Sequence, residues 1–225
     1  LKGKRIGLLT NISGFHHKVD TLMKKAVTDM KNAGAELIEI SFPIQREINN
    51  ASFEVMLFEF KDGLNKYFAT LGNSAPVKSI EELITFNLKD SVELRYFDQQ
   101  LLELAQSKGD IESAEYKKAL TLMMKGIREN GIDKIMDANK LDALIAPTGA
   151  PAWKTDQING DNFLGSSSSY AAIAGYPNIS VPMGNIDGLP VGISIFGRAW
   201  SEPVLIEIAY SYEQATKHRI KPEYR

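Results

Sequence analysis

The stretch that decides the fold is residues 4–41, which opens with Lys4-Arg5-Ile6-Gly7-Leu8-Leu9-Thr10 and closes with Glu36-Leu37-Ile38-Glu39-Ile40-Ser41. The first segment is a short apolar run and the second alternates apolar and polar residues, so both predict β-strands. Between them, apolar residues recur at spacings of three and four. With Asp20 as a helix cap and Gly34 as the stop, this spacing predicts a helix and therefore a β-α-β unit of an α/β protein.

The rest of the chain alternates a helical segment with a second group of strands. Helices are expected at residues 50–71, 79–88, 94–107 and 113–130, with one more before Leu141. Strands are expected at residues 141–148, 178–183 and 191–196, and Asp187-Gly188 suits a hairpin turn between the last two. A short helix is expected at 167–174, and Ser201 suits the cap of a final helix. The pattern predicts a mixed β-sheet flanked by α-helices.

Length and charge set the protein class. A chain of 225 residues with a formal net charge of -2 predicts one globular domain without a general attraction to nucleic acid. The absence of cysteine excludes disulfides and thiolate chemistry. No apolar run approaches the roughly 18 residues of a membrane span, and no signal peptide is visible, so we expect a soluble protein that contacts no membrane. This favours the cytoplasm over export, although a chain that opens with Leu1 leaves the compartment open.

Neither a cofactor nor a metal is predicted. The turn after the first strand, Asn11-Ile12-Ser13-Gly14, lacks the glycine pattern that binds nucleotide phosphates. His16, His17 and His218 do not have the spacing of a metal site, and the expectation is that they lie on the solvated surface. Glu81 and Glu82 are neighbours on a helix, so their side chains diverge and make a poor acid and base pair.

Four consecutive serines, residues 166–169, stand at the start of a predicted helix. Such hydroxyls could act as nucleophiles, but no general base is visible near them in the sequence. Serine is also a favoured helix cap, and small side chains allow close packing, so the residues favour capping and packing over catalysis. An intermediate role is to shape a substrate pocket, for which we nominate Ser166 and Ser167.

A polar loop at residues 151–161 follows a predicted buried strand and carries Trp153, Asp156 and Asp161. Ligands of α/β proteins commonly bind beyond the carboxyl ends of strands. This loop is therefore the best candidate substrate-binding site, with Trp153, Asp156 and Asp161 as its members. The alternative is that Trp153 simply packs the loop onto the core.

Several segments together resemble the C-terminal end of one family, the amidase-signature enzymes. The segments are Tyr170 to Gly184 (YAAIAGYPNISVPMG), Gly188 to Arg198 (GLPVGISIFGR), Tyr212 to Thr216 (YEQAT) and Asp142 to Thr148 (DALIAPT). The opening LKGKRIG, from Leu1 to Gly7, is similar to the strand that follows the signature segment of that family. The matches occur at both ends of the chain and in register, so the resemblance spans essentially all of it.

The resemblance implies part of the amidase-signature fold, with residues 1–225 as a single C-terminal portion that lacks the catalytic segment. It implies hydrolysis of a carboxamide C–N bond through a serine acyl-enzyme. The family's nucleophilic serine, its serine on a cis peptide and its lysine base would all lie upstream of Leu1, so no catalytic residue can be assigned here. We therefore expect the intact protein to be an amidase and this chain alone to be inactive.

Within the family, Asn159-Gly160-Asp161 and the turn Ala174-Gly175-Tyr176-Pro177 are more similar to peptide-amidase-like members than to the glutaminase component of glutamyl-tRNA(Gln) amidotransferase. That component carries an acid near the place of Gly165, and a glutaminase of that type is the alternative. A non-catalytic binding module on the same fold is a third hypothesis. The expected partners are a small-molecule or peptide amide and the missing N-terminal part. An apolar surface exposed by its absence would also favour self-association, such as a homodimer.

Overall fold

The computed structural model describes residues 1–222, apart from the side chains of Glu93 and Tyr96. The chain divides into two compact units. Unit 1 combines Leu1–Ile44 with Met124–Arg225, and unit 2 is Gln45–Met123. No helix in the described part of the chain is long and apolar enough to cross a membrane.

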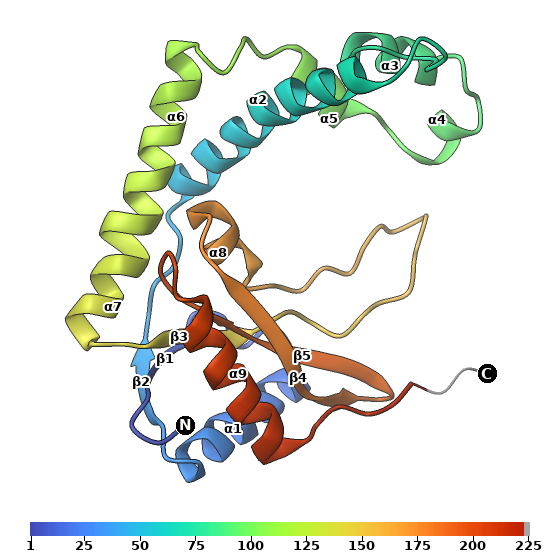
Figure 1. Cartoon of the computed structure of the whole chain (residues 1–225). Coiled ribbons are helices and arrows are strands. Elements are labelled where there is room, and N and C mark those ends of the chain that lie inside the picture. The colour runs from blue at the N-terminus through green and yellow to red at the C-terminus, as the bar shows by residue number, and fades with distance from the viewer. Residues whose placement is uncertain (223–225) are drawn as a thin grey trace. The chain divides into compact units, whose positions relative to one another are not determined.

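Unit 1 is built on a five-stranded mixed sheet in the order β2-β1-β3-β5-β4 (Figure 1). The strands are β1 (Arg5–Leu9), β2 (Glu36–Ile40), β3 (Ala143–Pro147), β4 (Asn178–Ile186) and β5 (Leu189–Phe196). The first three run parallel, whereas β5 is antiparallel to both β3 and β4. The predicted mixed sheet flanked by helices is confirmed, and Asp187 and Gly188 form the β4–β5 turn with positive φ angles of 51° and 89°.

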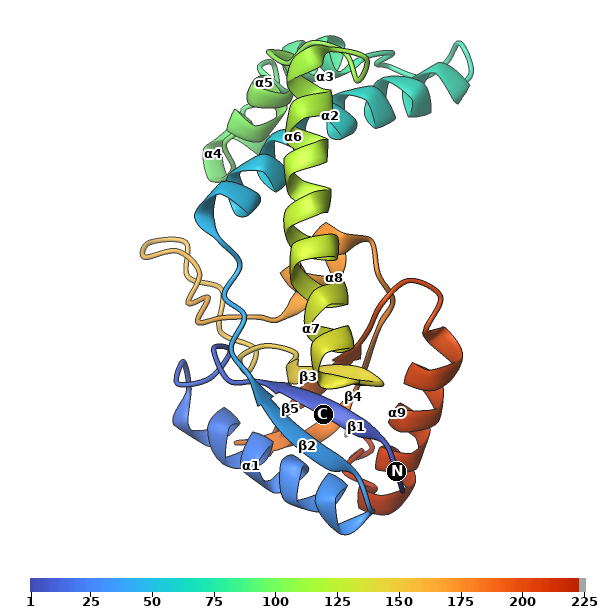
Figure 2. The same ribbon diagram turned by 90° about the vertical axis from the view of Figure 1, so that its left-hand side faces the viewer.

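One face of the sheet carries the main core of unit 1. Helices α1 (His17–Asn32) and α9 (Glu202–Thr216) pack on it, and Figure 2 shows α1 along the β1–β2 side. Both helices bury stripes at helical spacing, as expected for amphipathic helices. The buried residues contributed by the two helices are Val19, Met23, Ala26, Met30, Leu205, Ile208, Ala209 and Tyr212.

The start of α1 differs from the sequence prediction. The helix begins at His17, and the residue in the cap position is His16, whose Nδ1 accepts a hydrogen bond from the Val19 amide at 3.4 Å. Asp20 lies inside the first turn, and its carboxylate accepts from the Gly14 amide at 3.0 Å. The prediction that Asp20 caps the helix was therefore wrong, because its carboxylate binds the preceding loop.

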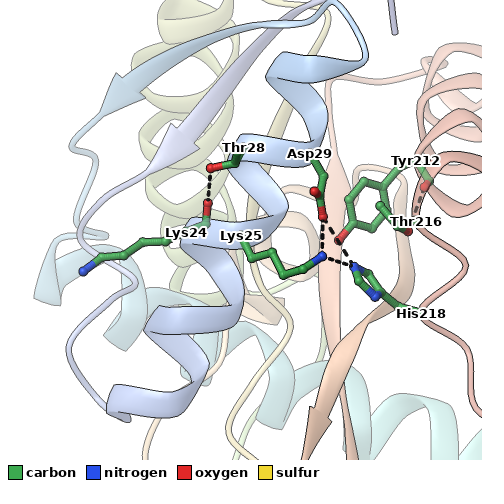
Figure 3. A network of polar contacts seen from close by, with 7 residues as sticks. All are labelled: Lys24, Lys25, Thr28, Asp29, Tyr212, Thr216 and His218. Carbon is green, nitrogen blue, oxygen red and sulfur yellow. Dashed lines mark hydrogen bonds and ion pairs between the residues drawn. The ribbon is translucent and has the colours of Figure 1, made fainter.

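Tyr212 is fully buried between α9 and α1, and its hydroxyl has no hydrogen-bond partner. Burial raises the pKa of the phenol, and the nearby Asp29 carboxylate raises it further. Figure 3 shows the ring beside Asp29 and His218. Because an unpaired buried hydroxyl opposes folding, we expect Tyr212→Phe to leave the free energy of unfolding unchanged or to raise it by up to about 1 kcal/mol. Urea denaturation measures this, and a loss above about 1 kcal/mol would contradict the unpaired state.

The other face of the sheet is covered by helix α8 (Ser168–Ala174), which lays Tyr170 against Phe196 of β5 with ring centroids 6.0 Å apart. The π-helix η1 (Lys125–Ile132) and helix α7 (Asp133–Asn139) also belong to unit 1. Arg128 of η1 donates to the Ala174 carbonyl at 2.6 Å, and Tyr176 donates to Asp133 of α7 at 2.8 Å. These contacts fix the end of α8 to η1 and α7.

Unit 2 is helical, as predicted. It contains α2 (Arg46–Thr70), α3 (Ile80–Asn87), α4 (Glu93–Tyr96), α5 (Gln100–Gln106) and most of α6 (Ala114–Met124). A small core holds Leu57, Ile80 and Ala105, each at most 2% exposed.

Two of the predicted helices are interrupted. The segment 94–107 is split into α4 and α5, because the Asp98 carboxylate accepts from the Gln100 amide and starts a new helix there. The segment 113–130 changes from α6 to the π-helix η1 at Lys125.

Candidate functional site

The predicted substrate-binding residues all lie on one excursion of unit 1, residues 149–167, which leaves the sheet directly after β3. Strand β3 is buried at every position, so the chain emerges from the core at a fixed place. The two ends of the excursion are joined by backbone hydrogen bonds. The Ala150 amide donates to the Gly165 carbonyl, and the Ser167 amide donates to the Thr148 carbonyl, both at 3.3 Å. The excursion is therefore a closed loop at the carboxyl end of the central strand β3.

Trp153 and Asp161 are brought together within this loop. The indole Nε1 of Trp153 donates to the Asp161 carboxylate at 3.1 Å, and its ring meets Phe163 edge to face at 6.1 Å. Trp153 remains 39% exposed and Phe163 64% exposed. The hydrogen bond and the ring contact of Trp153 both lie within the loop itself. The structure thus presents an aromatic pair with an adjacent carboxylate to solvent.

Asp156 stands apart from that pair and organises the tip of the loop. Its carboxylate accepts from the amides of Ile158 and Asn159 and from the Asn159 side chain, at 2.8 to 3.0 Å. These hydrogen bonds, that from the Asn159 amide first, hold the pKa of Asp156 below its usual value. Asp156 thus forms an Asx-type turn, in which its carboxylate oxygens are already occupied largely by hydrogen bonds from the backbone.

Ser166 and Ser167 lie where the loop enters α8. The Ser166 hydroxyl accepts from the Ser168 amide at 3.1 Å and donates to the Ser168 hydroxyl at 3.0 Å. Ser167 occupies the cap position of α8, yet its side chain makes no capping bond. The serine run does lie at the start of the helix, as predicted. The prediction that a serine side chain caps the helix is wrong for Ser167. This residue is 1% exposed and its hydroxyl has no partner, which leaves one buried hydrogen-bonding group unused.

Next to Ser167, three further hydroxyls that were not among the predicted site residues lie close together. Thr148 Oγ1 lies 2.8 Å from Ser180 Oγ on β4 and 3.0 Å from Ser194 Oγ on β5. Ser180 and Ser194 are direct partners in the antiparallel register, and Gly192 leaves space above them, since a Cβ there would approach the Ser180 and Thr148 hydroxyls to 2.6 and 2.9 Å. In the sequence, the three residues are visible only as one hydroxyl at the end of a predicted strand and one within each of two other predicted strands. Their proximity becomes apparent only when the pairing register of the strands is known.

The chemistry open to this site is recognition of a neutral polar group. Hydroxyls both donate and accept, so they match an amide, which has one carbonyl acceptor and N–H donors. In the described part of the chain, these hydroxyls bond one another or backbone amides, and none bonds a histidine, lysine or carboxylate. No group of three or more histidine or acidic side chains among residues 1–222 could hold a metal ion. The site can bind and orient an amide, but its described hydroxyls have no paired base.

The histidines do not supply that base. His16 serves the start of α1, and its ring stacks on His17 at 5.3 Å. His218 lies 3.5 Å from the Asp29 carboxylate and is only 18% exposed (Figure 3). The expectation that His218 is a solvated surface residue was wrong, because it packs against Tyr212 and closes the end of α9 onto α1.

Known proteins similar to this chain point to one family. The amidase family matches residues 1–206. A probable amidase of Arabidopsis thaliana is 34% identical over 229 residues, covering all of this chain and 40% of that protein. A glutamyl-tRNA(Gln) amidotransferase component of Clostridium botulinum is 32% identical, covering 99% of this chain and 47% of that protein. The chain thus spans somewhat less than half the length of these relatives.

Solved structures give the same result. A peptide amidase in complex with the competitive inhibitor chymostatin is similar with a TM-score of 0.92 and 42% identity, over 99% of this chain and 45% of that one. The native peptide amidase of Stenotrophomonas maltophilia gives a TM-score of 0.88 and 41% identity over the same shares. The sheet and helices described above are those of the amidase-signature fold, and the chain belongs to the amidase family.

Proposed function

We propose that this chain is the C-terminal part of an amidase that hydrolyses the C–N bond of a peptide-like carboxamide. The observation that carries the proposal is the 42% identity to a peptide amidase over 99% of this chain. That similarity covers 45% of the peptide amidase, so the proposal places the remaining machinery in a further segment of the same protein. The nucleophilic serine, the serine on a cis peptide and the lysine base of the family are proposed to lie there, upstream of Leu1.

In this proposal the chain supplies one wall of the substrate pocket. Trp153 would cover an apolar part of the substrate, and its partner Asp161 and the loop-ordering Asp156 would keep the excursion in place. The hydroxyl of Ser166 would hydrogen-bond the peptide groups, and the buried Ser167 would line the wall behind it. This assignment is supported by the position of all five residues on one loop after β3, where ligands of α/β proteins commonly bind.

The exposed apolar face of α2 supports the proposal that a further segment of the protein covers this helix. Phe53, Met56, Phe60 and Tyr67 recur at helical spacing and are between 40 and 58% exposed. A row of large apolar side chains on one helix is unusual at a free surface and typical of an interface. We propose that the N-terminal part of the same protein covers this face. In the isolated chain these exposed residues would favour the self-association expected from the sequence.

A glutaminase of the glutamyl-tRNA(Gln) amidotransferase type is the second candidate, because relatives with that name are up to 32% identical. In such a glutaminase an acid would stand near the place of Gly165. Here a Cβ at Gly165 would lie 3.1 Å from the Phe15 ring, so a side chain fits only if Phe15 moves. This packing favours a peptide-like amide over glutamine. A non-catalytic binding module is the alternative if translation begins at this strand.

The purified chain is expected to release no ammonia from peptide amides or glutamine above the level of a heat-inactivated sample. The physical reason is that no hydroxyl of the described site has a neighbouring base to activate it. The measurement is a coupled ammonia assay with an N-blocked amino acid amide and with glutamine. Turnover by the isolated chain would overturn the proposed place of the catalytic residues.

The control is the product of the whole gene, including about 200 codons upstream of Leu1. We expect it to hydrolyse the N-blocked amide faster than glutamine. Faster hydrolysis of glutamine would favour the second candidate, and an open reading frame that starts at β1 would favour the binding module.

A further inference from the structure

A groove of about 550 Å³ in unit 1 is lined by α1, by the end of β1 with the loop after it, and by Glu39 of the edge strand β2, and no residue of the excursion after β3 lines it. Its apolar floor includes Leu8, Met23 and Val27. Lys24 and Asp20 line it from α1, and Glu39 lines it from β2. The volume falls within the range of small-molecule sites, and the mixture of an apolar floor with a few charged groups is typical of them.

The sheet register explains why Glu39 reaches this groove. Leu8 and Glu39 are direct partners in the parallel β1–β2 ladder, so their side chains project from the same face of the sheet. Leu8 packs against the core that α1 covers. Glu39 therefore points to the α1 side, where an aliphatic residue would be expected if the groove served only as a packing surface.

Of the three charged side chains that line the groove, Lys24 and Glu39 are uncommitted, whereas the Asp20 carboxylate accepts from the Gly14 amide. In the described part of the chain, neither the Lys24 ammonium nor the Glu39 carboxylate takes part in a hydrogen bond or an ion pair. Figure 3 shows Lys24 extended away from the cluster in which Lys25, Asp29 and His218 satisfy one another. The neighbouring hydroxyls of Thr10 and Ser13 donate to the carbonyls of Ile40 and Thr10, which leaves their oxygens able to accept.

We propose that this groove binds a small zwitterion with an apolar side chain, of the class of the apolar amino acids. The ligand carboxylate would pair with Lys24, its ammonium with Glu39 and the hydroxyl acceptors, and its side chain would cover Leu8, Met23 and Val27. A ligand with only one of the two charges would make only one of these two charge-assisted hydrogen bonds. The proposal does not depend on amide hydrolysis, because it concerns binding to a separate groove.

The test is a titration of the purified chain with three probes, followed by the amide chemical shifts of residues 8–28 and 39. The probes are L-leucine, L-leucinamide, which lacks the carboxylate, and N-acetyl-L-leucine, which lacks the ammonium. We expect saturable binding of L-leucine and at least about tenfold weaker binding of the other two, because each loses one charge-assisted hydrogen bond.

Variants locate the ligand. Lys24→Met and Glu39→Gln are each expected to weaken the binding of L-leucine at least about tenfold while leaving thermal unfolding unchanged, since both side chains are exposed. Lys31→Met is the matched control, because Lys31 lies on the same helix outside the groove. We expect it to leave binding unchanged.

Three results would overturn the proposal. They are the absence of saturable L-leucine binding up to about 50 mM, equal binding of the three probes, and binding that both groove variants leave intact. None of these results bears on the amidase assay, so failure of this proposal and failure of the proposed function are distinguishable.

Discussion

Replacing Gly131 by alanine is expected to lower the free energy of unfolding of unit 1 by roughly 2–5 kcal/mol. Gly131 lies inside the π-helix η1 with φ -112° and ψ -107°, outside the helical region. A Cβ there would lie 2.5 Å from the Phe42 ring and 2.9 Å from the Gly126 carbonyl oxygen. Overpacking of a core costs about 1–3 kcal/mol, and holding a residue with a Cβ in a sparsely populated conformation costs a similar amount.

The matched control is Gly63→Ala in the interior of α2. Apart from Gly63 itself, its two chain neighbours and the surrounding backbone of α2, no atom lies within 4 Å of the place that its Cβ would take. A helical glycine exchanged for alanine at an open position gains about 0.5–1 kcal/mol, so this variant should be more stable. Urea denaturation of both variants, followed by circular dichroism, measures the difference. Equal stability of Gly131→Ala and the unchanged chain would show that Phe42 and η1 rearrange freely.

The sequence allowed the strands of unit 1 to be predicted because their patterns are local. Arg5–Leu9 is a short, mostly apolar run, and Asp187-Gly188 supplies the two positive φ angles that a tight hairpin needs. The order of the strands was not open to the same reasoning. Strand β3 lies between β1 and β5, a placement that depends on pairing with β1 residues 137 positions away and with β5 residues 46 to 52 positions away.

The change from α6 to the π-helix η1 could not be predicted from helical spacing, whereas the split between α4 and α5 has a local cause, the bond from the Gln100 amide to the Asp98 carboxylate. The sequence Lys125–Ile132 has helical spacing and gives no sign of a π-helix. The expected helix end at Asn130 coincides with the kink at Gly131, where Phe42, from the segment after β2, lies against the backbone. Similarly, His16 displaces Asp20 from the helix cap because Asp20 is held by the Gly14 amide of the folded loop.

In the candidate site, too, residues close together in the sequence could be predicted, whereas residues brought together by the fold could not. Trp153, Asp156 and Asp161 could be nominated because they share one polar loop after a buried strand, and the structure places all three on the closed excursion. The cluster of Thr148, Ser180 and Ser194 could not be nominated, because the residue after β3 and residues of two other strands supply it. The family resemblance was decisive for function, since no serine or threonine hydroxyl of the described site is paired with a base.

Replacing Asn11 by alanine is expected to lower the free energy of unfolding of unit 1 by about 2–4 kcal/mol. Asn11 follows β1, and its side chain donates to the Tyr170 hydroxyl at 2.6 Å and accepts from the Phe42 amide at 2.9 Å. Tyr170 in turn donates to the Phe42 carbonyl at 2.7 Å. This closed network joins the loop after β1, the end of β2 and helix α8, and burial of the phenol raises the pKa of Tyr170.

The expected loss is large because truncation at Asn11 leaves partly buried partners unsatisfied. The Phe42 amide is left without an acceptor, which costs about 1–3 kcal/mol, and the Tyr170 hydroxyl loses the bond it accepts while keeping the one it donates, a further loss of about 0.5–1.5 kcal/mol. Asn32→Ala, at the exposed end of α1, is the control and should change stability by less than about 0.5 kcal/mol. Urea denaturation of both variants is the measurement.

Tyr170→Phe provides an independent check, because it removes the hydroxyl that closes the network. If Asn11 acts through Tyr170, the double variant should lose less stability than the sum of the two single losses, since the contact between the two side chains is then counted once. Strict additivity would show that Asn11 stabilises unit 1 only through the Phe42 amide. Either result separates the contribution of the Asn11–Tyr170 bond, which holds α8, from that of the Asn11–Phe42 bond, which holds the chain after β2. The distinction matters for the proposed pocket wall, because α8 begins directly after Ser167.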